Sequence, residues 1–194
     1  VRYEFRMAEI PLYCDEPTTP EFSAPATAVR ALLEIARGAD LTENLTTLAK
    51  TGLCALSEEQ VCALENYAYT WPLTAADWRG TFTRSAAGYA GRDTEQDVQT
   101  LADAEAARAF LMERVAAFVK KAAGAPAAAL TKQLYLFLQS LGAEDALNRL
   151  AAALRDRGRL PDADEVLREW NVVMGLPDQL ARLLGDEVFA PVDY

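Results

Sequence analysis

Apolar residues recur at intervals of three and four over most of the chain, and this spacing places them along one side of an α-helix. Glycine and proline residues divide the pattern into segments of helical length. The pattern therefore predicts an all-α protein, an irregular bundle of about eight helices joined mostly by short links. One short extended segment is expected near the N-terminus, over residues 9–15, where a proline and mixed polarity interrupt the helical spacing.

The limits of the expected helices follow from residues that commonly begin or end a helix. Asp40, Ser57, Thr74 and Thr94 each precede an apolar-periodic segment and are suitable N-caps. Glycine closes several helices, and Pro72 stops the third because proline cannot continue a helix. The expected helices cover approximately residues 25–37, 41–51, 58–70, 75–79, 95–124, 126–141 and 143–157, and a last helix that begins at residue 161 or 162 and ends at 184.

The joint between the second and third of these helices is the most distinctive stretch of the chain. Gly52 suits the left-handed conformation that closes a helix. Ser57 and Gln60 have the Ser-x-x-Gln spacing of a capping box. The expected apolar face of the third helix contains Val61, Leu64, Tyr67 and Ala68. The stretch therefore predicts a helix–loop–helix corner packed into a core.

Each of the other long helices also has one side that is expected to face the core. For the first, second, sixth, seventh and last expected helices, in that order, the inward-facing residues are Val29, Leu32, Leu33 and Ala36; Leu41, Leu45 and Leu48; Leu130, Leu134, Phe137, Leu138 and Leu141; Leu147, Leu150, Ala151 and Leu154; and Val166, Leu167, Trp170, Val173, Met174, Leu180, Leu183 and Leu184.

Arg108 interrupts the apolar pattern of the longest helix, and Gly175 and Pro177 interrupt that of the last helix. Arg108 falls within the seam of the longest helix, which otherwise consists of Leu101, Ala104, Leu111, Val115, Phe118 and Ala122. We expect Arg108 either to extend to the edge of the seam or to pair with a carboxylate of a neighbouring helix. Pro177 removes a backbone hydrogen bond within the last helix, so a kink or a break is expected there.

Four aromatic residues, Trp71, Trp78, Phe82 and Tyr89, follow one another closely around an irregular segment. Such residues usually anchor a loop onto a core. The alternative is that they stack on unpaired bases of a nucleic acid.

Charge and size narrow the functions that this chain can have. With 194 residues and a hydrophobic fraction of 51%, it can bury a substantial core, in one domain or one domain with an appendage. The formal net charge of −10 repels phosphate backbones, which disfavours an isolated duplex-binding module. No signal peptide and no apolar run of transmembrane length is apparent, so a cytoplasmic protein without a membrane span is expected.

Residue types required by several classes of enzyme are missing. The chain has no histidine, which excludes Ser-His-Asp and Cys-His catalysis and histidine-ligated zinc. Cys14, Cys54 and Cys62 form no CxxC pair and are expected to be buried free thiols. Neither a GxxxxGK[ST] loop nor a GxGxxG motif is present.

Most carboxylates are scattered over solvated helix faces, and the remaining charged residues of interest lie at helix termini. Acidic side chains complement the positive end of a helix dipole, and those found at helix starts are Glu58, Glu59, Asp162, Asp164 and Glu165. Lys50 is expected to interact with the carbonyl end of its own helix. We therefore predict no catalytic, cofactor-binding or metal-binding residue, and from the residues alone the chain is a helical scaffold or an interaction module.

Several blocks of sequence resemble the AddB/RexB family, in the same order. Residues 48–67 (LAKTGLCALSEEQVCALENY) are similar to the family's LLKTGL…LSEEEVDLLENY stretch. The other similar blocks are residues 10–16 (IPLYCDE), 29–35 (VRALLEI), 78–79 (WR), 134–142 (LYLFLQSLG), 170–174 (WNVVM) and 178–185 (DQLARLLG). The resemblance covers nearly the whole chain, and Pro177 departs from the unbroken helix of the family.

The resemblance implies a role in DNA double-strand break resection and recombinational repair. AddB pairs with an AddA-type protein in an ATP-dependent helicase–nuclease of the UvrD/RecB-like superfamily, whose cofactors are ATP, magnesium and an iron–sulfur cluster. No position of this chain matches the family's nucleotide-binding loop, nuclease carboxylates or cluster cysteines. The chain is therefore expected to be a non-catalytic helical domain that holds no cofactor itself and reaches DNA through the parent complex, although the parent protein resembles an enzyme.

The resemblance also implies domain limits. Residues 1–16 are expected to be an extended lead-in that belongs to a neighbouring motor core, and residues 17–194 a helical, insertion-type domain truncated at its C-terminus. The chain reads as a piece of a longer protein, since no methionine opens it. The competing hypothesis is a free-standing helical protein-interaction module.

Overall fold

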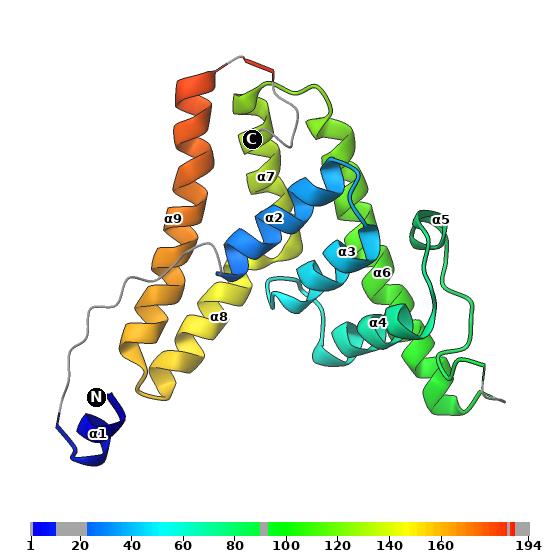
Figure 1. Cartoon of the computed structure of the whole chain (residues 1–194), viewed down its shortest axis with the longest axis horizontal. Coiled ribbons are helices and arrows are strands. Elements are labelled where there is room, and N and C mark those ends of the chain that lie inside the picture. Colours follow the sequence, from blue (N-terminus) through cyan, green and yellow to red (C-terminus); the bar gives the residue numbers. More distant parts are fainter. Residues whose placement is uncertain (1, 11–22, 90–92, 186, 189–194) are drawn as a thin grey trace.

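The computed structural model describes residues 2–10, 23–89, 93–185 and 187–188. Nine helices are present in these ranges (Figure 1). They are α1 (Arg2–Met7), α2 (Ala24–Ala36), α3 (Leu41–Lys50), α4 (Glu58–Thr70), α5 (Ala75–Arg79), α6 (Glu95–Ala122), α7 (Ala127–Leu141), α8 (Ala143–Asp156) and α9 (Leu160–Leu184). The described residues contain no strand, so the predicted all-α class is confirmed.

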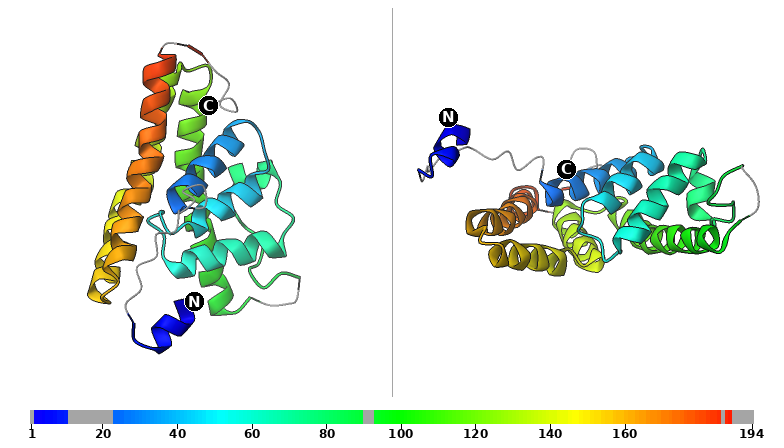
Figure 2. Two further views of the ribbon diagram at one scale, coloured as in Figure 1. Left: turned by 60° about the vertical axis from the view of Figure 1, so that its left-hand side comes forward. Right: turned by 90° about the horizontal axis from the view of Figure 1, so that it is seen from below.

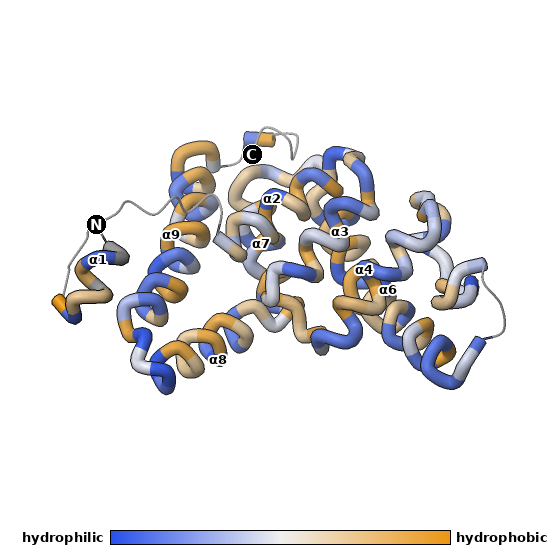
Figure 3. The backbone as a smooth tube through the Cα atoms, turned by 60° about the horizontal axis from the view of Figure 1, so that its bottom comes forward, coloured by the Kyte–Doolittle hydropathy of each residue, from blue (hydrophilic) through white to orange (hydrophobic). Residues whose placement is uncertain are grey.

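The long helix α6 organises the bundle. A row of helices runs from α6 through α7 to the α8–α9 hairpin, and α2, α3 and α4 lie on one side of this row (Figure 2). The most extensive contact is between α4 and α6. Hydrophobic and hydrophilic residues alternate along each helix at helical spacing (Figure 3), as expected where one side of each helix is buried. Among the described residues, none of the helices has both the length and the apolar character that crossing a membrane requires.

The predicted helix starts are confirmed by hydrogen bonds. The side chains of Asp40, Ser57, Thr74 and Thr94 each accept a hydrogen bond from the backbone N–H three residues later. The capping box of α4 is complete, with Ser57 Oγ 3.2 Å from the Gln60 nitrogen and Gln60 Oε1 3.1 Å from the Ser57 nitrogen. Capping of this kind stabilises a helix by roughly 1 kcal/mol.

The corner between α3 and α4 packs against a distant part of the chain. Gly52 has a φ of +73°, the predicted left-handed conformation, and the following residues Leu53 and Cys54 are buried. The backbone N–H of Ala55 donates to the Leu141 carbonyl at the end of α7, at 2.8 Å. The most distinctive stretch of the sequence therefore fixes two helices to each other and to the α7–α8 turn.

The core is formed by the helix faces that the periodicity predicts, with several corrections. On α2 the buried residues are Pro25, Ala28, Ala31, Leu32 and Ile35, most of them one position away from the predicted set, because small alanines allow close packing there. Leu150 and Leu183, predicted to face inward, are 48% and 80% exposed. Both side chains therefore face solvent at least in part.

Two further predictions need correction, one about the last helix and one about the N-terminal segment. α9 runs unbroken from Leu160 to Leu184, so a break at Pro177 is wrong. The buried hydroxyl of Thr131 on α7 donates to the Pro177 carbonyl at 3.0 Å, which ties this part of α9 to its neighbour. Near the N-terminus, residues 2–7 form a helix where an extended lead-in was expected. Most of the expected extended segment, including Cys14, lies outside the described residues.

Candidate functional site

Buried polar side chains gather beneath the irregular connection between α4 and α6. We refer to residues 72–89, which include the short helix α5, as the α5 loop. Side chains from α3, α4 and α6 hold this loop by hydrogen bonds to its backbone and to its tryptophan. The region combines a buried hydrogen bond from Arg108 to the Trp78 carbonyl with several half-buried ones, and it is therefore the first candidate for a functional site.

Arg108 and Glu105 on α6 form the centre of the cluster. The Arg108 guanidinium donates to both carboxylate oxygens of Glu105, each at 2.6 Å. Its Nη1 also donates to the Trp78 carbonyl at 2.8 Å, and the backbone N–H of Phe82 donates to Glu105 Oε2 at 2.9 Å. Neither prediction for Arg108 is correct: the residue is 8% exposed, and its carboxylate partner comes from its own helix.

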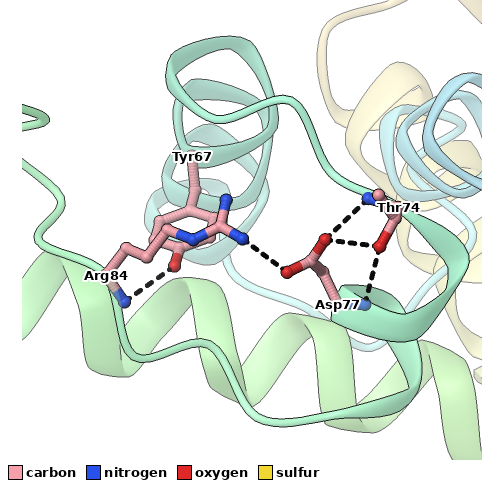
Figure 4. A network of polar contacts seen from close by, with 4 residues as sticks. All are labelled: Tyr67, Thr74, Asp77 and Arg84. Atoms are coloured by element: carbon pink, nitrogen blue, oxygen red, sulfur yellow. Dashed lines mark hydrogen bonds and ion pairs between the residues drawn. The ribbon is translucent and has the colours of Figure 1, made fainter.

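A second group of contacts ties the outer part of the α5 loop to α4. The Tyr67 hydroxyl accepts a hydrogen bond from the backbone N–H of Arg84 at 3.1 Å (Figure 4). The Arg84 guanidinium pairs with Asp77 at 2.6 Å, and Asp77 also completes the capping box of Thr74. Burial of Tyr67 raises the pKa of its hydroxyl.

The ionisation of the two carboxylates reflects these contacts. Burial opposes ionisation of Glu105, but the Arg108 guanidinium and the Phe82 N–H outweigh it and lower the pKa of this carboxyl. The hydrogen bonds from Thr74 lower the pKa of Asp77. Both groups are therefore held as anions whose oxygens bind structural donors, an arrangement that stabilises the loop.

The aromatic cluster anchors the loop, as predicted, for three of its four members. Trp71, Trp78 and Phe82 are buried, and Phe82 stacks on Tyr67 with ring centroids 4.3 Å apart. The Trp78 indole N–H donates to the Thr42 hydroxyl at 2.9 Å. Tyr89 is the exception: it is 87% exposed and meets Trp71 only edge-on. The buried rings offer no open face for a base.

The remaining residues singled out in the sequence lie apart from this cluster. Cys54 is buried, and burial raises the pKa of its thiol to about 12, whereas Cys62 is exposed, contrary to expectation. Lys50 pairs with Glu65 of α4 at 2.7 Å, in place of the expected contact with its own helix end. Among the described residues, no group of His, Cys, Asp and Glu side chains is arranged to hold a metal ion.

Some polar contacts that were not predicted from the sequence nevertheless have a recognisable signal in it. Glu105 and Arg108 are three residues apart on a helix, a spacing that brings oppositely charged side chains together. Asp77 and Asp97 stand three residues after Thr74 and Thr94, as in a capping box. The partners on the α5 loop, by contrast, are backbone groups, which no residue type identifies.

Comparison with known proteins gives several relatives that are named as B-type subunits of ATP-dependent helicase/deoxyribonucleases. The chain is 28% identical to the one from Acetivibrio thermocellus over 144 residues, which is 72% of this chain and 13% of the relative. The protein of the same name from Alkaliphilus metalliredigens is 25% identical over 205 aligned positions, 98% of this chain and 17% of the relative. The protein of that name from Clostridium novyi is 22% identical over all of this chain and 16% of its own length. The chain is a distant relative of these B-type helicase/deoxyribonuclease subunits.

The similarity to the B-type subunits is low in identity but extends along nearly the whole chain, as the resemblance of the sequence blocks predicts. No family model matches the sequence. The chain spans about a sixth of the length of these relatives. Their names therefore describe proteins several times larger than the helical bundle seen in this structure.

Proposed function

We propose that this chain is a non-catalytic helical domain of a B-type subunit of an ATP-dependent helicase/deoxyribonuclease, which acts in DNA double-strand break resection and recombinational repair. The observation that carries the proposal is the similarity to the B-type subunits along nearly the whole chain. It is supported by the polar groups under the α5 loop, which form hydrogen bonds within the protein and hold the loop in place. The relatives carry one and the same name, and the similarity to several of them covers more than nine-tenths of this chain.

The polar cluster under the α5 loop supports a structural role. A catalytic carboxylate needs free lone pairs or a proton to transfer at the reacting atom. Both oxygens of Glu105 are instead bound by Arg108, and one also accepts from the Phe82 backbone. Every buried side-chain nitrogen and oxygen among the described residues has a hydrogen-bond partner. The groups of this cluster are occupied in holding the loop.

The apolar outer side of α9 supports a place within a larger protein. Val172, Leu176 and Leu183 are 42%, 55% and 80% exposed and repeat at intervals of four and seven along the helix. Such a side favours contact with another part of a longer chain or with a second protein. An AddA-type protein is the partner implied by the family resemblance, and such a complex would work on DNA in the cytoplasm.

The proposal is tested with the purified chain of 194 residues. It is incubated with ATP and magnesium in the presence of single-stranded DNA and of tailed duplex DNA. We expect no ATP hydrolysis or DNA cleavage above the buffer control, and single-stranded DNA binding weaker than about 10 μM at about 0.15 M salt, since the chain has a large negative charge. ATP hydrolysis, DNA cleavage or tighter DNA binding would contradict the non-catalytic scaffold role.

A further inference from the structure

A half-open groove lies between α6 and α7, which are neighbours in the bundle (Figure 1). Its volume is about 250 Å³, enough for one large side chain and part of a second. The residues that line it are Glu113, Arg114, Ala117, Phe118 and Lys121 of α6, with Gln133, Leu136, Phe137 and Ser140 of α7. The groove is on different helices from the α5 loop and the outer side of α9.

The groove lies at a locally basic part of an acidic chain, since Arg114 and Lys121 line it together with a single carboxylate, that of Glu113. Between Glu113 and Glu144 the sequence contains four cationic residues, Arg114, Lys120, Lys121 and Lys132, and no aspartate or glutamate. The remaining residues carry a formal charge of −14, because these four positive charges are part of the total of −10. A local potential of opposite sign to that of the whole chain selects an acidic partner.

The two cations that line the groove are arranged differently. Arg114 is fixed: its Nε donates to the Ser140 carbonyl at 2.8 Å, its Nη1 donates to the Phe110 carbonyl at 2.9 Å, and it lies 3.7 Å from the centre of the Phe110 ring. Arg114 Nη1 also lies 3.6 Å from Oε2 of Glu113, an exposed carboxylate that lines the groove as well. The Nη2 of Arg114 takes part in no hydrogen bond or ion pair with the residues that the structure describes, so it remains for another acceptor. Lys121 is exposed and takes part in no hydrogen bond or ion pair with the residues that the structure describes. Its ammonium group is therefore available to a carboxylate.

The floor of the groove is apolar, but it has no open aromatic face. Phe118 and Phe137 are each 3% exposed, and their ring centroids are 5.7 Å apart in a tilted arrangement. Leu136, which is 39% exposed, contributes the accessible apolar surface. A nucleic-acid base binds best on an exposed ring. An aliphatic or phenyl side chain that enters end-on fits this floor better.

We propose that the α6–α7 groove binds an acidic peptide segment of a partner protein, with a large apolar side chain of the peptide against Leu136 and its carboxylates at Lys121 and Arg114. This is the helix-groove type of peptide recognition, in which an apolar anchor supplies affinity and flanking charges supply specificity. The groove is formed by α6 and α7 of this chain alone. The proposed binding of an acidic peptide therefore does not depend on which larger protein contains the chain.

The test measures binding of a fluorescent peptide, in which glutamates surround a Leu-Phe pair, to the 194-residue chain by fluorescence anisotropy. We expect saturable binding with a dissociation constant of about 10–100 μM at about 50 mM salt, weakened at about 300 mM salt. Lys121→Glu and Leu136→Glu should each weaken binding at least about tenfold. Both residues are exposed, and circular dichroism checks that the variants remain folded.

The matched control is Arg149→Glu, which makes the same charge change on the exposed side of α8. It should change the dissociation constant less than about twofold, since its charge lies outside the groove. Equal weakening by Arg149→Glu, or no saturation at about 1 mM peptide, would overturn the proposal. So would tighter binding of an oligothymidylate that is lost in Lys121→Glu, because the groove would then be a nucleic-acid contact.

Discussion

The α5 loop contains only five residues of helix, whereas α8 and α9 are regular over 14 and 25 residues. The irregular loop is nevertheless anchored by the larger side chains. Trp78 is completely buried, and Arg108 and Glu105 bind the loop backbone. Irregular backbone has few hydrogen bonds of its own, so polar side chains from neighbouring helices must supply them.

The α8–α9 hairpin has the opposite construction. Its own small core consists of Ala151, Leu154 and Ala163, and its backbone hydrogen bonds are made within the two helices. Its ion pairs, Arg155 with Asp164 and Arg159 with Asp162, are largely exposed and stabilise little. The comparison shows that the regular element depends mainly on side-chain packing, with one buried hydrogen bond from Thr131 to the Pro177 carbonyl, whereas the irregular one depends on packing together with a cluster of polar contacts.

Among these substitutions, replacement of Trp78 should have the largest effect on the free energy of unfolding. Trp78→Ala removes a fully buried ring and its hydrogen bond to Thr42, and it should lower the free energy of unfolding by about 4 kcal/mol. Trp170→Ala on α9, where the ring is only half-buried, should cost roughly 1–2 kcal/mol. Urea denaturation followed by circular dichroism measures both. Equal losses in the two variants would contradict the contrast between the two regions.

Removal of the buried cation should come next. Arg108→Met leaves the Glu105 carboxylate and the Trp78 carbonyl without their donor, and it should destabilise the chain by about 3 kcal/mol. Amide hydrogen exchange should also show loss of protection in the α5 loop before the rest of the bundle. If exchange increased first in α8 and α9, the assignment of this arginine to the loop would be wrong.

A substitution in α9 should have the opposite sign. Proline within a helix is about 3 kcal/mol less favourable than alanine, and the Thr131 hydroxyl binds the residue-177 carbonyl, which alanine retains. Pro177→Ala should therefore stabilise the chain by about 1–2 kcal/mol, after allowance for the lost packing of the buried ring. Thermal unfolding measures the change. A lower melting temperature would show that the proline ring is needed for packing against α7.

The two regions should also respond oppositely to pH. The pKa of Glu105 is lowered from 4.5, so its contribution to stability is present at neutral pH and is lost as the pH falls through its folded-state value. Burial, with repulsion from Glu165, raises the pKa of Glu169 on α9 above 4.5, so protonation there adds stability as the pH falls toward 4.5.

The variants that separate these two contributions are Glu105→Gln and Glu169→Gln. Glu105→Gln should lower the urea midpoint at pH 7 and reduce its fall in acid, whereas Glu169→Gln should raise the midpoint slightly at pH 7 and have no effect near pH 4. A loss of stability at pH 7 in both variants would contradict the opposite signs.

Local signals in the sequence were sufficient for the helix ends, because a cap such as Ser57 with Gln60 is set within a few residues. The α5 loop could be predicted only as an aromatic anchor, since hydrogen bonds to the backbone of Trp78 and Phe82 come from residues 30 and 23 positions away. The outward leucines Leu150 and Leu183 were missed for another reason. Periodicity identifies an apolar side of a helix but does not show whether this chain covers it.

The central claim is that the buried polar cluster serves to hold the α5 loop, and a double-mutant cycle of Arg108→Met and Glu105→Gln tests it most directly. We predict a coupling energy of about 1–3 kcal/mol in urea denaturation, because Arg108 is buried and Glu105 is largely shielded from water, so each is poorly hydrated without its partner. The same cycle on Arg159 and Asp162, also three residues apart but exposed, should give about 0.5 kcal/mol or less. Additive effects of the Arg108 and Glu105 substitutions, or equal coupling in the two pairs, would contradict the claim.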